Sequence, residues 1–265
     1  MENKEKGVFM KYNIGIDIGS ACAKTVVMDE NGMILHRLLQ PTGWSSIDTA
    51  QAIREKLEQL GVDFGEAAVV ATGYGRISVP YADKTVTEIT CHGLGACYVH
   101  NSKNLAVIDI GGQDTKLILV ESGIVKDFIM NDKCSAGTGR FLEVMANTLG
   151  LRPDALCELA AEGGNTSISS MCTVFAESEV ISLIGRGEKK ENIAFAVVDS
   201  IVKKVGSQAS RLTVHGDVCL TGGLCEFTYL KDSLSHHLGK PVHACPDGRY
   251  AGAIGAALSA SKIRK

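Results

Sequence analysis

The chain has 265 residues and a formal net charge of −3, and its 45% hydrophobic and 22% charged residues are ordinary for a globular protein. This length allows two lobes with substantial cores, and the charge argues against a nucleic-acid surface. No apolar stretch is long enough to cross a membrane, so we expect no membrane partner. The negative net charge leads us to expect no nucleic-acid partner either. Residues 1–10 are expected to be a disordered extension and not a signal peptide. We therefore expect a cytoplasmic protein, whose nine cysteines imply a reducing compartment, and the lack of a Cys-x-x-Cys pair disfavours zinc ribbons and thioredoxin chemistry.

The first half of the chain opens with a buried strand that ends in a carboxylate. The apolar segment 13–19 predicts a strand running into Asp17 and a tight turn. Segments 24–29 and 33–38 then predict a hairpin around Asn31-Gly32, which is a strong two-residue turn signal. Further elements are predicted at 47–60 (helix), 67–71 (strand), 72–76 (glycine-rich loop) and 88–98 (helix).

The opening unit recurs further along the chain. The octapeptide Asp17-Ile-Gly-Ser-Ala-Cys-Ala-Lys24 aligns without a gap with Asp109-Ile-Gly-Gly-Gln-Asp-Thr-Lys116, at an offset of 109 − 17 = 92 residues. The second copy again follows an apolar strand, 105–111, and precedes a hairpin around Ser122-Gly123. A strand–turn–hairpin unit used twice predicts two related α/β lobes that face each other. We place these lobes at 11–102 and 103–265, with the last helix packing back on the first lobe.

Beyond the second hairpin the pattern favours helices. They are predicted from beyond Cys134 to 149, at 156–162 after a turn at Pro153, from about 173 onward and over 193–212, with a strand at 218–221 and a small-residue helix at 252–257.

The two Asp-Ile-Gly turns predict a polyphosphate site. Backbone N–H groups at Gly19 and Ser20, and at Gly111 and Gly112, can approach phosphate oxygens because no bulky side chain intervenes. A single Asp-x-Gly sequence is usually only a turn, and it is the repetition that favours nucleotide binding.

Other side chains near these turns have suitable chemistry. Asp17 and Asp109, at strand ends, suit Mg²⁺, which keeps several waters and takes few carboxylates. Gln113 can orient an attacking water, the role of a glutamine in slow nucleotide hydrolases. Lys24 is a candidate to counter the phosphate charge, and the pair Gly222-Gly223 is a candidate contact for the adenosine.

Two cysteine motifs suggest a metal centre. Cys134, in the run 131–140, and Cys172, in the run 170–175, each precede a predicted helix start, where the dipole favours a thiolate. The second helix would have an acidic first turn at Glu177 and Glu179. Two thiolates per chain cannot complete a four-sulfur shell, whereas a two-fold dimer supplies the missing pair. The alternative stays open that these cysteines, like Cys91, Cys97, Cys219 and Cys225, are packing residues.

The motifs taken together resemble a known superfamily. The order Asp-Ile-Gly-Ser, Asp-Ile-Gly-Gly-Gln-Asp and Thr-Gly-Gly is similar to that of the actin, sugar kinase and heat-shock ATPases. The runs 131–140 and 170–179 look more narrowly like the activators of 2-hydroxyacyl-CoA dehydratases. That family includes the ATPase subunits of benzoyl-CoA reductase and the reductases of double-cubane cluster proteins.

The resemblance implies a fold, a cofactor set and partners. It implies two actin-like (ribonuclease H-like) lobes of mixed sheets flanked by helices, with ATP or ADP and Mg²⁺ in the cleft between them. It also implies one 4Fe–4S cluster per homodimer, held by Cys134 and Cys172 of both subunits. ATP hydrolysis would drive low-potential one-electron transfer from a ferredoxin or flavodoxin to a separate iron–sulfur acceptor, a dehydratase or a double-cubane cluster protein. The family's phosphate-loop positions fall on Ser20, Ala21, Cys22, Ala23 and Lys24.

This chain departs from the family pattern at two places in the expected adenosine region. It has Leu224-Cys225-Glu226-Phe227 after the glycine pair and Arg249-Tyr250 near its end, and we take Arg249 as a candidate nucleotide-binding residue. Two other functions remain open on the sequence. One is a small-metabolite kinase of the same fold with structural cysteines, and the other is a non-enzymatic ATP-binding module with zinc at a dimer interface.

Overall fold

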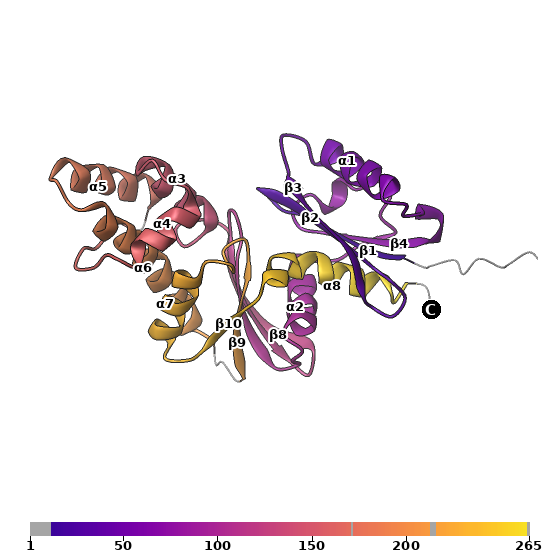
Figure 1. The fold of residues 1–265 in the computed structure, drawn as a ribbon. Coiled ribbons are helices and arrows are strands. Elements are labelled where there is room, and N and C mark those ends of the chain that lie inside the picture. The colour runs from indigo at the N-terminus through magenta and orange to yellow at the C-terminus, as the bar shows by residue number, and fades with distance from the viewer. Residues whose placement is uncertain (1–11, 171, 213–215, 264–265) are drawn as a thin grey trace, which may run out of the picture. The chain divides into compact units, whose positions relative to one another are not determined.

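The computed structural model describes residues 12–170, 172–212 and 216–263 (Figure 1). Contacts divide the chain into two compact units, with unit 1 formed by residues up to Gly95 and from Gly252, and unit 2 by Ala96–Ala251. The chain therefore crosses between units twice, and the sequence-based boundary after residue 102 falls slightly beyond the first crossing. The predicted extension, 1–10, lies outside the described residues.

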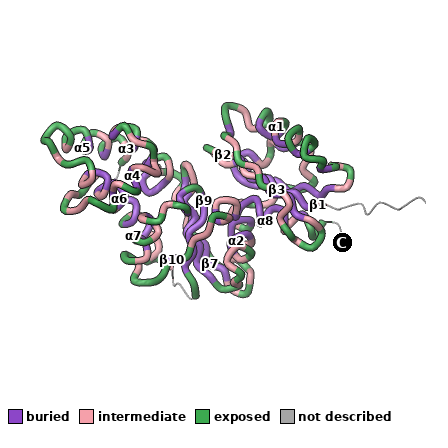
Figure 2. Tube along the Cα trace, viewed as in Figure 1, coloured by how far each residue is buried: buried purple, intermediate pink, exposed green. Residues whose placement is uncertain are grey.

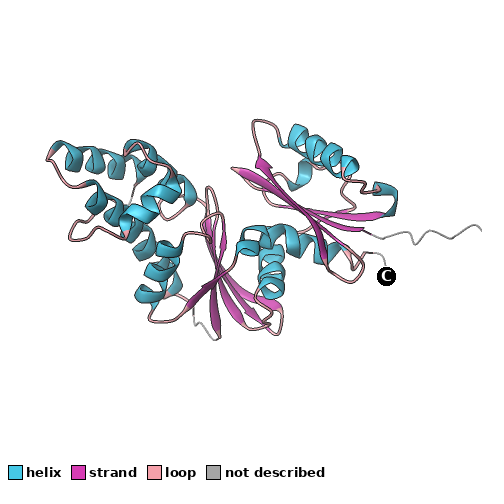
Figure 3. Ribbon diagram, viewed as in Figure 1, coloured by secondary structure: helices cyan, strands magenta, loops and turns pink. Residues whose placement is uncertain are grey.

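Unit 1 is a five-stranded sheet with helices on both faces (Figure 3). Its strand order is β3-β2-β1-β4-β5. The elements are β1 (Tyr12–Ile18), β2 (Cys22–Met28), β3 (Ile34–Pro41), α1 (Ser46–Gln59), β4 (Ala67–Thr72), β5 (Lys84–Thr85), α2 (Glu88–Val99, which enters unit 2) and α8 (Ala251–Ala260), with 3-10 turns at Phe64–Glu66 and Arg76–Ser78. The sheet is mixed because β2 and β3 pair antiparallel next to β1, while β4 and β5 pair parallel on its other side.

Small residues let the helices of unit 1 lie directly on the sheet and on each other. A methyl group at Gly15 of β1 would collide with the backbone of α8 at Ala253 and Ala257. Likewise, a methyl group at Gly255 of α8 would collide with the carbonyl of Cys91 in α2. The backbones of β1, α8 and α2 are thus in direct contact, which fixes their relative positions within this unit.

Unit 2 repeats the same sheet plan, with strand order β10-β9-β6-β7-β8. Its elements are β6 (Leu105–Ile110), β7 (Thr115–Glu121), β8 (Ile124–Asn131), α3 (Gly139–Thr148), α4 (Pro153–Ala160), α5 (Thr173–Gly185), α6 (Lys190–Ala209), β9 (Asp217–Gly222), α7 (Thr228–Leu238), β10 (Val242–Ala244) and a 3-10 turn at Pro246–Tyr250. An antiparallel hairpin again flanks the first strand on one side and a parallel strand flanks it on the other. The predicted repeat and fold class are confirmed.

The core of unit 2 lies between this sheet and α3, α4, α6 and α7 (Figure 2). Helix α6 contributes a continuous buried face and is the best-packed helix of the unit. By contrast, α5 buries only Ala176 and Val180, and much of its surface is exposed. In the described residues no helix is long and apolar enough to cross a membrane.

Three sequence-based expectations are corrected here. Pro153 does not form a turn before α4 but occupies its first turn, where its missing N–H costs nothing. Helix α5 begins at Thr173, so Glu177 and Glu179 lie beyond its first turn. Helix α3 begins at Gly139 with Thr138 as its N-cap, so Cys134 lies in the preceding loop and not next to the helix start.

The contact between α8 and α2 predicts a strong effect of a small substitution. Gly255→Ala should lower the free energy of unfolding by about 1–3 kcal/mol, because the added methyl group has to displace the Cys91 carbonyl. Gly185→Ala is the matched control, since nothing lies within 4 Å of a methyl group at that helical glycine. Urea unfolding of both variants checks this, and equal stabilities would show that α2 and α8 adjust freely.

Candidate functional site

The two repeated aspartates lie at equivalent places in the two sheets. Asp17 of β1 is paired with Lys24 on β2 and with Thr72 on β4. Asp109 of β6 is paired in the same way with Lys116 and with Thr221. Both carboxylates are nearly inaccessible, with 3% and 1% of their residue surface exposed. The register therefore places a lysine and a threonine on either side of each buried carboxylate.

A glycine follows each threonine and brings its backbone against the carboxylate. Gly73 and Gly222 have φ of +81° and +85°, a conformation that other residues rarely adopt. A Cβ atom at Gly73 would lie 2.5 Å from Asp17 Oδ1, and one at Gly222 would lie 3.0 Å from Asp109 Oδ1. The Thr-Gly pair is thus part of the repeat, although the octapeptide alignment did not include it.

The aspartate of unit 2 is engaged by side chains of its own unit. Lys116 Nζ lies 3.3 Å from Asp109 Oδ2 and 2.8 Å from Asp114 Oδ1. Thr221 Oγ1 donates a hydrogen bond of 2.8 Å to Asp109 Oδ1. Because Lys116 is almost fully buried between two carboxylates, its single charge is already shared by both acids and is not available to a phosphate.

The aspartate of unit 1 has looser partners. Lys24 Nζ lies 3.9 Å from Asp17 Oδ2, and 17% of the Lys24 side chain is exposed. Cys22 occupies the position that Asp114 has in the other repeat, so no second carboxylate holds this lysine at that position. On the other side, His92 Nε2 of α2 lies 4.0 Å from the same oxygen, and Gly252 of α8 packs against both groups. Sequence reasoning missed His92, because only the packing of α2 brings it to Asp17.

The turns after the aspartates use part of their own backbone. Gly19 N donates to Cys22 O at 3.2 Å and Gly111 N donates to Asp114 O at 2.9 Å. Of the four N–H groups predicted to bind phosphate, Ser20 and Gly112 are therefore the better candidates. Gln113 is exposed at the tip of its turn, and its role in orienting water stays a prediction.

The turn of unit 2 is bonded directly to the start of α3. Gly139 N donates to Gly111 O at 2.9 Å, and Arg140 N donates to Gly112 O at 2.8 Å. Thr115 Oγ1 donates to Gly137 O at 2.7 Å. The bonds from Gly139 and Arg140 satisfy the first N–H groups of the helix, which would otherwise lack partners. They attach the loop that contains Cys134 to the candidate phosphate turn.

Cys134 and Cys172 lie in loops that a hydrogen bond joins. Cys172 is exposed and is the N-cap residue of α5, and Cys134 is partly buried. The hydroxyls of Ser135 and Thr173, the residues that follow the two cysteines, lie 2.7 Å apart. Asn131 Nδ2 also donates to the carbonyl of Cys134 at 2.8 Å. The chain segments that contain the two cysteines are thereby joined within unit 2.

Burial keeps several other cysteines protonated. It raises the pKa of Cys91, Cys157 and Cys225 to about 12 and raises that of Cys219 further. Such thiols pack as small apolar groups, as predicted for Cys91, Cys219 and Cys225. Within the described part of the chain, no three His, Cys, Asp or Glu side chains are placed to hold a metal ion.

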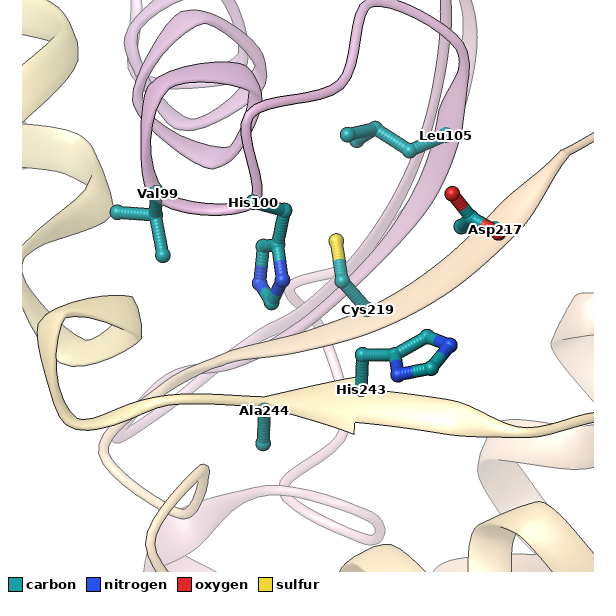
Figure 4. Close-up of a pocket in the computed structure, with 7 residues that line it drawn as sticks. All are labelled: Val99, His100, Leu105, Asp217, Cys219, His243 and Ala244. Carbon is teal, nitrogen blue, oxygen red and sulfur yellow. The ribbon is translucent and has the colours of Figure 1, made fainter.

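A separate cavity of about 560 Å³ lies in unit 2 at the beginnings of β6 and β9 (Figure 4). His100, at the end of α2, and the sulfur of Cys219 point into it, with His243 on the neighbouring strand. Leu105 and Asp217, at the first positions of their strands, place it at the end of the sheet opposite Asp109. It is therefore distinct from the repeated turns.

The predicted adenosine region contains an ion pair. Arg249 lies 3.3 Å from the carboxylate of Glu226, so both departures from the family pattern meet in one contact. Gly223 N donates to Ile110 O at 3.1 Å, which holds the glycine pair against the end of β6. Arg249, Gly222 and Gly223 thus stay candidate nucleotide contacts, and the cleft expected between the lobes stays a prediction.

The repeated mixed sheets belong to the actin-like and sugar-kinase fold class. Residues 14–260 match the BadF/BadG/BcrA/BcrD ATPase family, and the chain belongs to this family. It is 41% identical to the (R)-2-hydroxyglutaryl-CoA dehydratase activating ATPase of Acidaminococcus fermentans, over 95% of this chain and 97% of that protein. The resemblance drawn from the motifs is confirmed.

Two solved structures agree with this assignment. The crystal structure of component A of that Acidaminococcus fermentans dehydratase matches with a TM-score of 0.90 over 96% of this chain and 98% of its own. The activator of the 2-hydroxyisocaproyl-CoA dehydratase from Clostridium difficile, with bound ADPNP, matches with a TM-score of 0.88 at 34% identity, over 95% of each chain.

The two repeat lysines should respond differently to the same substitution. Lys116→Met should lower the free energy of unfolding by about 3–5 kcal/mol, because it leaves two buried carboxylates without their cation. Lys24→Met should cost clearly less, since its contact is longer and its side chain is partly exposed. Chemical unfolding of the two variants measures the difference, and equal losses would contradict the assigned division of roles.

Proposed function

We propose that this ATPase is an iron–sulfur activator. In this proposal a homodimer hydrolyses ATP and passes single low-potential electrons from a ferredoxin or flavodoxin to a separate iron–sulfur enzyme. The acceptor is a 2-hydroxyacyl-CoA dehydratase or a double-cubane cluster protein. The observation that supports it best is the set of bonds joining the Gly111-Gly112 turn to the Cys134 loop and that loop to Thr173.

The residues around Asp17 fit a nucleotide with Mg²⁺. Its carboxylate lies against the backbone at Gly73 and Gly252, and its lysine is not tied to a second acid at the position of Cys22. Mg²⁺ takes few protein carboxylates and keeps its waters, so Asp17 would hold the ion through water. Asp109, which Lys116 and Thr221 already engage, would act through water as well. The ion would neutralise charge on the phosphates.

The loops of Cys134 and Cys172 fit a cluster shared by two chains. Cys172 caps α5 and has no side-chain hydrogen bond in that role, so its sulfur remains available at the positive end of the helix dipole. Four thiolates bind a 4Fe–4S cluster, and two copies of this pair supply four. When bound, the cluster would supply one-electron redox chemistry.

Helix α5 has an exposed apolar surface close to Cys172, which a partner protein could contact. Val174 and Phe175, in the first turn of α5, have 66% and 67% of their surface exposed. Ile181 and Ile184, further along the helix, are exposed at 56% and 45%. An apolar helix face of this kind favours a protein interface over solvent. It supports the proposal that α5 contacts a second subunit or the electron acceptor.

The cluster assignment predicts the iron content of cysteine variants. Cys134→Ala and Cys172→Ala should each lose the iron of anaerobically purified protein and weaken the dimer, because two of four ligands disappear. Cys97→Ala and Cys219→Ala are the controls and should retain it. Iron analysis with size-exclusion chromatography measures both properties. A full cluster per monomer after Cys172→Ala would overturn the assignment, and wild-type protein without iron that phosphorylates a small metabolite would favour the kinase alternative.

The nucleotide assignment predicts a specific defect for the exposed glutamine. Gln113→Ala should slow ATP hydrolysis by ~10²-fold, as is typical for the loss of one positioned polar group. Nucleotide affinity should change much less, since the backbone N–H groups of the turns remain. Steady-state hydrolysis and equilibrium ADP binding distinguish these effects. Unchanged turnover would show that a different residue orients the water.

A further inference from the structure

The chain segment that leads to Cys172 is bonded to the side of α5. Glu179, in the second turn of that helix, accepts hydrogen bonds of 3.1 Å from the backbone N–H of Ser169 and of Ser170. The hydroxyl of Ser169 lies 3.2 Å from the same carboxylate. One side chain thus gathers two consecutive backbone donors.

These bonds hold the chain on both sides of Cys172. After the cysteine, its carbonyl accepts from Ala176 N at 2.8 Å, in the first hydrogen bond of α5. Before it, the carboxylate of Glu179 binds Ser169 and Ser170. The backbone is therefore bonded to α5 both before and after the cysteine.

Two further contacts hold this segment: Ile168 packs against the core of unit 2, and the side chain of Thr166 hydrogen-bonds Glu188. Residues 165–170 alternate between exposed and half-buried, and none is buried. A loop with few buried contacts opens at low cost unless polar bonds hold it. Partial burial would raise the pKa of Glu179, but the hydrogen bonds from Ser169 and Ser170 lower it below the usual value, so the carboxylate is charged at neutral pH.

We infer that Glu179 is a positioning residue for Cys172, holding this thiol ready to bind a metal cluster. The inference rests on the proposed function. The corresponding residue for the other cysteine is Asn131, whose amide binds the carbonyl of Cys134. Each cysteine loop is thus hydrogen-bonded by one polar side chain, Asn131 at the end of β8 for Cys134 and Glu179 of α5 for Cys172. This role replaces the expected contribution of Glu179 to the first turn of the helix.

The same helix offers a matched control. Glu177 also accepts a side-chain hydrogen bond, at 3.2 Å, but from Thr148 Oγ1 of α3 and not from the segment before Cys172. Both carboxylates are partly exposed, so the loss of either charge should affect the helix alike. A difference between the two variants then isolates the effect on the cysteine loop.

The test compares Glu179→Ala, Glu179→Gln and Glu177→Ala in the anaerobically purified protein. Loss of a residue that orients a metal ligand typically weakens binding 10–100-fold, so a chelator should remove iron from Glu179→Ala at least about tenfold faster than from wild type. Glu179→Gln, which keeps one acceptor oxygen, should be intermediate, and Glu177→Ala should behave as wild type. The electron paramagnetic resonance spectrum of the reduced protein should change only in the Glu179 variants.

Hydrogen exchange provides the readout that does not need iron. The amides of Ser169 and Ser170 should exchange faster in apo Glu179→Ala than in apo wild type, and Glu177→Ala should leave them protected. Iron release and spectra that are equal in Glu179→Ala and Glu177→Ala would overturn the inference while leaving the proposed function intact. Wild-type protein that binds no iron would overturn both. If Glu179→Ala does not fold, the Glu179→Gln result decides in the same way.

Discussion

The placement of a buried carboxylate at the end of the first strand is the constraint on which both units depend. A carboxylate out of water needs partners, and the register of the sheet provides a lysine from the antiparallel neighbour and a threonine from the parallel one. The glycine after that threonine lets the backbone turn against the carboxylate, which a larger residue would prevent. A mixed sheet with one antiparallel and one parallel neighbour is the arrangement that supplies all three.

The two units use this arrangement for different purposes. In unit 2 the second acid, Asp114, completes a buried ion network with Lys116. In unit 1 a cysteine takes the place of that acid, and the lysine keeps part of its surface exposed. Buried charges that are already paired gain little by exchanging partners. A carboxylate and a cation with a longer contact can instead bind a ligand. Divergence at one position of the repeat thus encloses the lysine of unit 2 and leaves that of unit 1 partly exposed, while each turn keeps a candidate phosphate-binding N–H group, at Ser20 and at Gly112.

The turn of unit 2 is also bonded to the region of the two cysteines. Its carbonyls accept the first N–H groups of α3, so the Cys134 loop is fixed to the turn by main-chain bonds. The Cys172 loop is fixed to α5 through Glu179 and is joined to the Cys134 loop by the Ser135–Thr173 contact. A change at the turn therefore reaches one cysteine through backbone and the other through side chains. Such a short route is what coupling between a nucleotide and a cluster would require.

The sequence by itself determined the local elements, the repeat and the chemistry of the candidate groups. Turn signals such as Asn31-Gly32 and apolar strands ending in Asp-Ile-Gly depend on neighbouring residues, so they can be recognised along the chain. The bounds of helix α7 were not predicted, because it buries only Leu230 and Leu234, which leaves a weak periodic pattern.

Only the tertiary structure decided which of the candidate groups are free to act. The two octapeptides predict equal roles for Lys24 and Lys116, but the second is enclosed between Asp109 and Asp114 and the first is not. Neither the approach of His92 to Asp17 nor that of Glu179 to Ser170 leaves a signal in the sequence. Both depend on how a helix packs or how a loop folds back along it. Which charges pair and which groups are exposed depend on how the elements pack, and the spacing of residues along the chain does not show either.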